Sequence, residues 1–264
     1  MGMLAIGIAS LAALLLASPS SAARIDADEA LARSEAAIGA VISDHRLLRS
    51  DGSSFRMVEL KGKPLVVSLI YTSCSTVCPA STQTLKEAVR HARATLGRDS
   101  FQVLTLGFDA RNDTPRRLSA FAIDHDIAGD PSWHVATASP AVLATLLDEI
   151  GFSYSGAAGG FEHITQITIV DAEGKVYRQV HGDEFPLQVL MEPLKQLVYG
   201  VRMTSFTPAA LADRVRFLCT VYDPKLGRYR LDYTIFAEAG AGLLSFLLMG
   251  WILARMWRAA RRST

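Results

Sequence analysis

Residues 65–79 read LVVSLIYTSCSTVCP, and this stretch decides the fold. Its first seven residues form a continuous apolar run rich in β-branched side chains, which is typical of a buried strand. Cys74 and Cys78 follow, and beyond Pro79 apolar residues recur with helical spacing. The pattern therefore predicts two thiols at the point where a buried strand gives way to a helix.

Segments with strand and helix patterns alternate on both sides of this junction. Before it, two short alternating stretches within residues 41–61 flank a turn at residues 50–53, which predicts a β-hairpin. After it, strands are expected at 101–108, 133–136, 164–170 and 176–180, and helices at 115 onward, 140–151 and 186–201. Ser139 is expected to cap the second of these helices, and residues 156–160 form a glycine-rich loop. Strands that alternate with helices, followed by a late hairpin, predict an α/β domain with a mixed sheet.

Apolar segments lie at both ends of the chain. Residues 4–17 predict either a cleaved secretory signal ending near Ala23 or a retained anchor. Residues 235–254 carry a single charge, Glu238, and at about 1.5 Å per residue they are long enough to span a bilayer. Four arginines follow within residues 255–262 and indicate the cytoplasmic side. We therefore expect one C-terminal span in a bacterial inner membrane, with the main domain in the periplasm.

These signals divide the chain into six expected segments. They are a signal peptide at 1–23, an N-terminal arm or short helix at 24–40, the main domain at 41–202, a juxtamembrane hairpin at 203–234, a transmembrane helix at 235–256 and a basic tail at 257–264.

The overall charge of the chain excludes one class of partner. The sequence has 27 Lys and Arg against 26 Asp and Glu, which leaves a net charge of +1. Such a balance gives no general attraction to nucleic acid, so we expect no nucleic-acid partner.

The cysteine pair carries the chemistry expected of the main domain. Free N–H groups and the partial positive charge at a helix N-terminus favour thiolate, which is both a nucleophile and a ligand for soft metals. The C-x₃-C spacing of Cys74 and Cys78 allows a disulfide, a redox dithiol or a metal site. Zinc and iron–sulfur centres usually take four protein ligands, and the third cysteine, Cys219, is remote. Copper held by two sulfurs and one imidazole best fits the ligands that the sequence offers, with His163 and His181 as the candidate imidazoles.

A longer stretch around the cysteines, GKPLVVSLIYTSCSTVCP, resembles the signature of the Sco/SenC family of copper-handling proteins. The likeness continues through LTLGFDARNDTP, WHVATASPAVLATLLDEIGFSY and HITQITIVDAEGKVYRQVHG, and it covers about residues 41–200. The resemblance implies a thioredoxin-like fold with an N-terminal β-hairpin, which binds one copper ion through two cysteines and one histidine.

Carried over residue by residue, the resemblance names the site. It implies that Cys74, Cys78 and His163 are the copper ligands. Asp109 and Asp113 match an acidic loop of the family that is proposed to support the site or the partner, although the same loop also fits a solvated turn with a helix cap.

Two features depart from the family pattern. The family usually has Asp-His-Ser at the ligand histidine, where this chain has Glu162-His163-Ile164, so the surroundings of the ligand are expected to differ. The family anchor is usually N-terminal, whereas the span expected here is C-terminal.

The resemblance implies a membrane-anchored metallochaperone that delivers copper to the binuclear copper site of a respiratory cytochrome oxidase. Periplasmic thiol reductants or copper donors would be further partners. The alternative is a thiol–disulfide oxidoreductase in which Cys74 and Cys78 form a redox dithiol and keep the cysteines of the oxidase, or of another copper site, reduced. A copper or redox sensor is a third interpretation, but the short tail after Arg255 leaves little room for a cytoplasmic output.

Overall fold

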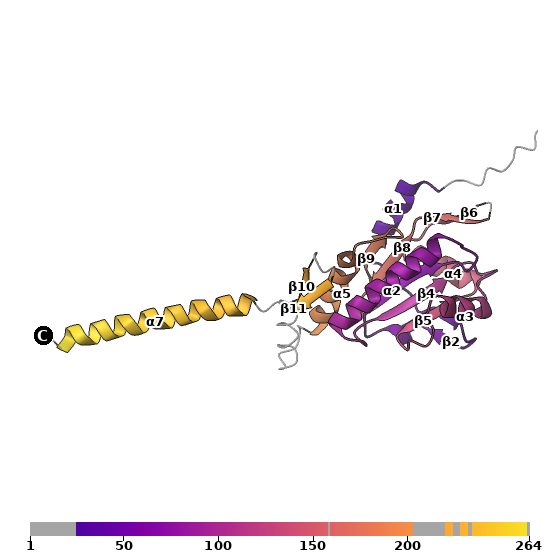
Figure 1. The fold of residues 1–264 in the computed structure, drawn as a ribbon. Helices are drawn as coiled ribbons and strands as arrows, with labels where there is room; N and C mark the ends of the chain where they lie inside the picture. The colour runs from indigo at the N-terminus through magenta and orange to yellow at the C-terminus, as the bar shows by residue number, and fades with distance from the viewer. Residues whose placement is uncertain (1–24, 158, 203–219, 224–227, 232–233, 263–264) are drawn as a thin grey trace, which may run out of the picture.

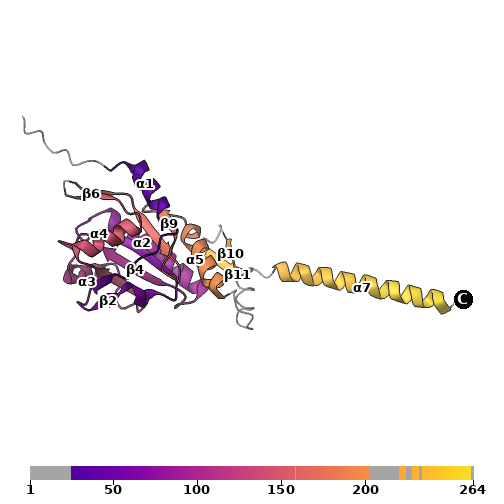
Figure 2. The ribbon, with the colours of Figure 1, turned by 180° about the vertical axis from the view of Figure 1, so that it is seen from behind.

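The computed structural model describes residues 25–157, 159–202, 220–223, 228–231 and 234–262 (Figure 1). Most of these residues form one α/β domain, and the long helix α7 (Thr234–Arg262) extends away from it in both views (Figures 1 and 2). The predicted signal peptide and Cys219 lie outside the described residues.

A seven-stranded mixed sheet forms the centre of the domain, with the order β2-β1-β5-β4-β3-β8-β9. Its strands are β1 (Arg46–Arg49), β2 (Ser54–Arg56), β3 (Leu65–Ile70), β4 (Gln102–Gly107), β5 (Trp133–Thr137), β8 (Gln166–Val170) and β9 (Val176–His181). Strands β3, β4 and β5 are parallel, whereas β8 and β9 continue the sheet in antiparallel pairing beyond β3. The predicted mixed sheet and the hairpin of β1 with β2 are therefore confirmed.

Strand β3 lies inside the sheet between β4 and β8 and is buried along its whole length, because helices cover the sheet (Figure 1). The helices are α1 (Ala27–Ala36), the short 3₁₀ helix η1 (Met57–Leu60), α2 (Val77–Leu96), α3 (Pro115–Asp124), α4 (Pro140–Glu149) and α5 (Leu187–Arg202). Helices α2 and α5 pack against each other, and α3 contacts β5. Burial on both faces explains why β3 is a continuous apolar run in the sequence.

Helix starts follow the predicted signals, with one correction. Thr114 caps α3 by accepting a hydrogen bond from Arg117 N–H, and Pro115 occupies the first turn. Ser139 stands at the N-cap position of α4, but its side chain makes no capping hydrogen bond, so the predicted role of its hydroxyl is wrong. Helix α2 begins at Val77, before Pro79, because a proline is tolerated in the first turn. Cys78 therefore lies inside the helix and Cys74 just ahead of it.

The N-terminal arm is a helix that packs on the domain. Asp26 caps α1 through its carboxylate, and Ala30 and Ser34 are buried. The Ser34 hydroxyl lies 2.9 Å from His181 Nε2 at the end of β9. Figures 1 and 2 show α1 beside β9 and the hairpin of β6 and β7. Of the two alternatives for residues 24–40, the structure has the helix.

One element was not predicted. The glycine-rich segment expected as a loop is a second hairpin, in which β6 (Tyr154–Ala157) pairs with β7 (Gly160–His163). This hairpin stands outside the main sheet and ends on His163. Its pairing therefore decides where the predicted histidine ligand lies.

The C-terminal region contains the expected hairpin, with β10 (Thr220–Asp223) antiparallel to β11 (Arg228–Leu231), and β11 contacts α2. The predicted membrane span falls in α7. Among the residues that the structure describes, no helix combines the length and the apolar character needed to cross a membrane, so the predicted span lacks structural support.

Candidate metal centre

The two cysteines lie on either side of the start of α2. Cys78 is 1% exposed and Cys74 is partly exposed, and both are free thiols. The backbone N–H of Cys78 donates to Cys74 Sγ across 3.3 Å, and Cys74 N–H donates to the carbonyl of Tyr71 across 3.0 Å. The helix terminus therefore presents a hydrogen-bond donor directly to the outer sulfur.

The two thiols differ in acidity. Burial of Cys74 alone would raise its pKa, but the backbone N–H groups of Cys78 and Thr76 outweigh that effect, and the pKa of Cys74 is lowered. Burial raises the pKa of Cys78 to about 12, and the neighbouring charges of Cys74 and Asp113 act in the same direction. At neutral pH Cys74 is therefore the thiol disposed to ionise, and Cys78 keeps its proton until a metal or a reaction removes it.

Asp113 ties the cysteine loop to the acidic loop. One carboxylate oxygen, Oδ1, accepts hydrogen bonds from the backbone N–H and the hydroxyl of Thr72, each at 2.7 Å. The other, Oδ2, accepts from the backbone N–H of Asp109 at 2.9 Å. Asp113 is 1% exposed, and burial raises its pKa despite these hydrogen bonds. Its carboxylate thus fixes Thr72, two residues before Cys74.

Asp109 organises its own loop. Its Oδ1 accepts from Arg111 N–H at 3.2 Å and its Oδ2 from the Asn112 side-chain amide at 2.6 Å. The side chain is buried, with 7% exposed. Asp109 therefore shapes the turn that brings Asp113 to Thr72, which gives the acidic loop a supporting role through hydrogen bonds.

His163 lies in an aromatic cluster at the end of β7. Its ring centroid is 6.0 Å from that of Tyr71, and 5.6 Å from those of Phe108 and Phe152. The His163 Nδ1 atom is 3.0 Å from the carbonyl oxygen of Ile164. A carbonyl only accepts, so Nδ1 carries the proton and the lone pair of Nε2 is free to bind a metal.

The three predicted ligands are near one another but are not assembled. Within the described part of the chain, no three His, Cys, Asp or Glu side chains converge closely enough to hold a metal ion. Tyr71 adjoins both sides of the gap: burial and the Cys74 side chain raise the pKa of its hydroxyl, and its ring lies edge-on to the His163 ring at 85°. The triad of Cys74, Cys78 and His163 therefore stays a prediction that requires the histidine and the thiols to approach each other.

The other candidate imidazole has structural partners. His181 Nε2 meets the Ser34 hydroxyl, and His181 Nδ1 lies 3.7 Å from a carboxylate oxygen of Glu35. Both ring nitrogens of His181 therefore face α1. The geometry favours His163 as the imidazole donor.

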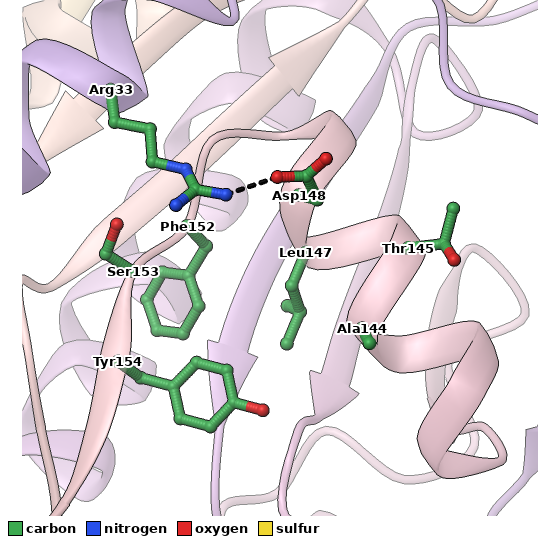
Figure 3. A pocket seen from close by; sticks show the side chains of 8 residues that line it. All are labelled: Arg33, Ala144, Thr145, Leu147, Asp148, Phe152, Ser153 and Tyr154. Atoms are coloured by element: carbon green, nitrogen blue, oxygen red, sulfur yellow. Dashed lines mark hydrogen bonds and ion pairs between the residues drawn. The ribbon is translucent and has the colours of Figure 1, made fainter.

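A hollow of about 510 Å³ adjoins the aromatic cluster (Figure 3). Phe152 and Tyr154 line it, and the ion pair between Arg33 of α1 and Asp148 of α4 lies across it. The hollow places α1 next to the side chains that surround His163.

The site residue that the sequence reasoning missed is Tyr71. Tyr71 is the last residue of the apolar run that decides the fold, so the sequence pattern indicates only that it is a buried strand residue. Its hydroxyl was the one available signal, since a buried tyrosine usually finds a hydrogen-bond partner.

A sequence profile of SCO1/SenC matches residues 33–199. The chain belongs to the SCO1/SenC family. Its mixed α/β domain is the thioredoxin-like fold of Sco proteins, as predicted.

Individual relatives of this SCO1/SenC chain are distant. The SCO1 protein homolog of Bacillus subtilis (strain 168) is 26% identical over 87 residues, which is 33% of this chain and 44% of that relative. The match thus spans less than half of the relative's length. The structure of a putative electron transfer protein from Aquifex aeolicus VF5 is 28% identical, with a TM-score of 0.57 over 62% of this chain and 95% of that one. The structure of Bradyrhizobium japonicum ScoI with copper bound shares the fold at 21% identity and a TM-score of 0.50, over 60% of this chain and 99% of that one.

Proposed function

We propose that this SCO1/SenC protein takes up one copper ion through Cys74, Cys78 and His163 and passes it to the copper site of a respiratory cytochrome oxidase. The observation that carries the proposal is the pair of free thiols at the start of α2, where the backbone N–H groups lower the pKa of the outer thiol. Related solved structures support it: Bradyrhizobium japonicum ScoI and yeast Sco1 each contain copper, and another relative is described as a member of the Sco family of cytochrome c oxidase assembly proteins.

The donor set has the chemistry that this cargo needs. Thiolates and a neutral imidazole suit Cu(I), whereas hard oxygen ligands do not. Loading removes the proton of Cys78, because metal ligands must be deprotonated. His163 offers Nε2 once the short link between β7 and β8 lets its ring approach the sulfurs. A three-ligand site leaves room for an incoming donor, so transfer to a partner proceeds by ligand exchange.

Copper retention by the reduced full chain tests the proposal. Cu(I) is titrated against a chromophoric chelator with the wild type and with Cys74→Ser, Cys78→Ser and His163→Ala. We expect one ion per wild-type chain, no stable retention by the cysteine variants, and at least about tenfold weaker binding by His163→Ala, since even the partners of metal ligands are worth about 10–100-fold.

His91→Ala serves as the control, because His91 lies on the outer surface of α2, beside Glu87 and Arg90, and is expected to bind copper like the wild type. Wild-type protein that retains no copper would overturn the proposal. Unchanged affinity in His163→Ala would remove the histidine from the site.

Anchoring to a bacterial inner membrane, with the domain in the periplasm, is part of the proposal. It rests on the apolar residues 235–254 and the arginines that follow them. Large apolar side chains of α7 between residues 243 and 253 are exposed, which supports a lipid-facing role. Alkaline carbonate washing of membranes tests it: the full chain should remain with the membranes and a chain ending at residue 234 should be released. Release of the full chain would contradict the anchor.

A thiol–disulfide oxidoreductase is the second candidate, and the unequal thiols favour it. The Cys74 thiolate would attack a sulfur of the partner's disulfide, forming a mixed disulfide and releasing one partner thiolate. Cys78 would then lose its proton and attack Cys74 Sγ, which releases the second partner thiolate. The chain is oxidised to a Cys74–Cys78 disulfide, and the partner gains two electrons. The proton released by Cys78 and one from solvent convert its two thiolates to thiols.

Two variants separate the candidates. Cys78→Ser should trap the mixed disulfide with the copper-site cysteines of the oxidase if exchange is the function. His163→Ala should abolish delivery but leave exchange intact if copper transfer is the function. Loss of both activities in His163→Ala would contradict this division of roles.

A further inference from the structure

The Tyr71 side chain lies between the outer cysteine and the hairpin that carries His163. We infer that the Tyr71 hydroxyl is a positioning residue, which joins Cys74 to the β6–β7 hairpin and so sets where His163 rests relative to the sulfur. The inference deepens the proposed copper function and rests on it for its biological meaning.

The Tyr71 hydroxyl feels both parts of the site. Burial raises the pKa of Tyr71, the Cys74 side chain raises it further, and the backbone of Phe161 lowers it. Phe161 belongs to β7, two residues before His163. Because a hydroxyl both donates and accepts, it can donate to the Cys74 sulfur while it accepts from the Phe161 N–H, and we infer that it joins the two in this way.

Ring contacts fix the orientation of the hydroxyl. The Tyr71 ring packs edge-on against Phe161 at 5.2 Å and 79°. It also packs against Phe108 at 5.5 Å. These contacts hold the ring in the cluster that surrounds His163, and Tyr71 is 8% exposed. Tyr71 is therefore a rigid spacer rather than a side chain that rotates freely in solvent.

Gly160 shows how closely the hairpin approaches this hydroxyl. A Cβ placed on Gly160 would lie 2.8 Å from the Tyr71 hydroxyl oxygen, closer than real Cβ atoms come, and 3.1 Å from the nearest ring carbon, which is also a tight contact. The other glycine in these two strands, Gly156, has nothing within 4 Å of a Cβ placed on it. The hairpin thus packs closely on Tyr71 at Gly160, whereas the space around Gly156 is open.

The consequence concerns the closing of the site. His163 Nε2 must come to the sulfurs, and the Tyr71 ring packs on His163 while the Cys74 side chain influences the Tyr71 hydroxyl. As long as the hydroxyl keeps its two partners, the hairpin is held at the distance that the ring imposes. Breaking the contact with Phe161 frees β7 to move while the Tyr71 ring keeps its packing on Phe108.

The test compares two matched pairs of variants in the full chain. Tyr71→Phe removes the hydroxyl and keeps the ring, and Tyr154→Phe does the same to a neighbouring tyrosine that packs on Phe161 and Phe108. Gly160→Ala pushes on the Tyr71 hydroxyl, whereas Gly156→Ala adds the same methyl group in open space. Circular dichroism confirms that all four variants are folded before they are compared.

The first readout is amide hydrogen exchange of Phe161 and His163 in metal-free protein. We expect exchange about fivefold faster in Tyr71→Phe, as for the loss of one net hydrogen bond, and faster in Gly160→Ala. The two control variants should exchange like the wild type. In the double variant Tyr71→Phe/Gly160→Ala the increase should be smaller than the product of the single effects, because the alanine methyl group no longer meets the hydroxyl.

The second readout is the rate at which a chelator removes Cu(I) from loaded protein. It should rise about fivefold in Tyr71→Phe and stay unchanged in Tyr154→Phe. Unchanged exchange in both Tyr71→Phe and Gly160→Ala would overturn the inference, whatever the copper result. A wild type that binds no copper, together with the expected exchange changes, would overturn the proposed function while leaving Tyr71 as the residue that positions the hairpin.

Discussion

At the scale of single residues, the site depends on the different environments of two neighbouring thiols, which shift their pKa values in opposite directions. Cys74 receives backbone N–H groups at the start of α2, whereas Cys78 is enclosed in the core beneath it. The sequence predicts the helix N-terminus, because strand, cysteine loop and proline follow one another locally. It does not predict the inequality, since burial of Cys78 depends on residues packed from distant parts of the chain.

Alkylation should reveal this inequality. Only thiolate reacts, so the rate for Cys74 should rise with pH and reach half of its maximum below pH 9.0, the ordinary thiol value, since the pKa of Cys74 is lowered. Cys78, with a pKa of about 12, should remain unmodified between pH 6 and 9. Iodoacetamide labelling of the reduced chain, followed by peptide mass analysis, measures both rates. Equal rates for the two cysteines would contradict the account.

Asp113 should contribute to stability through its hydrogen bonds. In Asp113→Asn one acceptor oxygen becomes an amide that donates, so either the Thr72 groups or the Asp109 N–H lose their acceptor in a buried site. We expect a loss of about 1–3 kcal/mol in the free energy of unfolding, measured by urea titration. Asp124→Asn, on the exposed end of α3, should change it by no more than about 0.5 kcal/mol. A loss no larger than in this control would show that the Asp113 bonds do not matter.

At the scale of elements, the strands were predicted where burial dominates and missed where it does not. Strands β3, β4 and β8 have apolar runs because the sheet is covered. The β6–β7 hairpin lacks such a run, and its glycines indicate a loop. It is stabilised by tertiary packing of Tyr154 and Phe161 on Phe108, which no local pattern reveals.

Docking of α1 is a second element-scale feature that the sequence left open. Gly151 has a positive φ of 68°, and a Cβ there would lie 2.6 Å from the Arg33 carbonyl oxygen. Gly129 has a φ of 82°, and a Cβ there would have nothing within 4 Å, so an alanine at this position would suffer backbone strain but no clash. The two glycines therefore separate backbone strain from helix docking.

Gly151→Ala should destabilise the protein more than Gly129→Ala. Backbone strain costs about 1 kcal/mol in each, and the clash with α1 adds about 1–3 kcal/mol in Gly151→Ala. Urea titration measures the difference, and amide exchange in α1 should increase only in Gly151→Ala. Equal destabilisation by the two substitutions would show that α1 is not held at this contact.

At the scale of the whole molecule, the sequence predicts the ligands and the fold, but it does not place the ligands relative to one another. His163 and Cys74 are separated by the Tyr71 ring, whose position depends on three elements at once. Three histidines elsewhere in the domain are also partly buried, and burial lowers the pKa of each: His125, His134 and His181.

Stability should therefore fall with mild acidification. A histidine whose pKa is lowered in the folded state contributes its full stabilisation when the pH is above 6.5, the ordinary histidine pKa. This stabilisation is lost as the pH falls through the lowered pKa. His134 is the clearest case, because Arg49 donates to its Nδ1 at 2.7 Å and leaves no room for a second proton. The free energy of unfolding should drop between pH 7.5 and pH 5, and less so in His134→Gln. Asp113, whose raised pKa has the opposite effect, is present in both proteins, so its contribution cancels when the wild type is compared with His134→Gln. An equal drop in the two proteins would contradict the role of His134.

The central claim is that two sulfurs and one imidazole complete a single copper site. X-ray absorption of the reduced full chain loaded with one equivalent of Cu(I) tests it most directly. The account predicts two sulfur scatterers and one imidazole nitrogen around copper in the wild type, with the nitrogen lost in His163→Ala. Copper bound by sulfur alone in the wild type, or an imidazole signal that persists in His163→Ala, would contradict it.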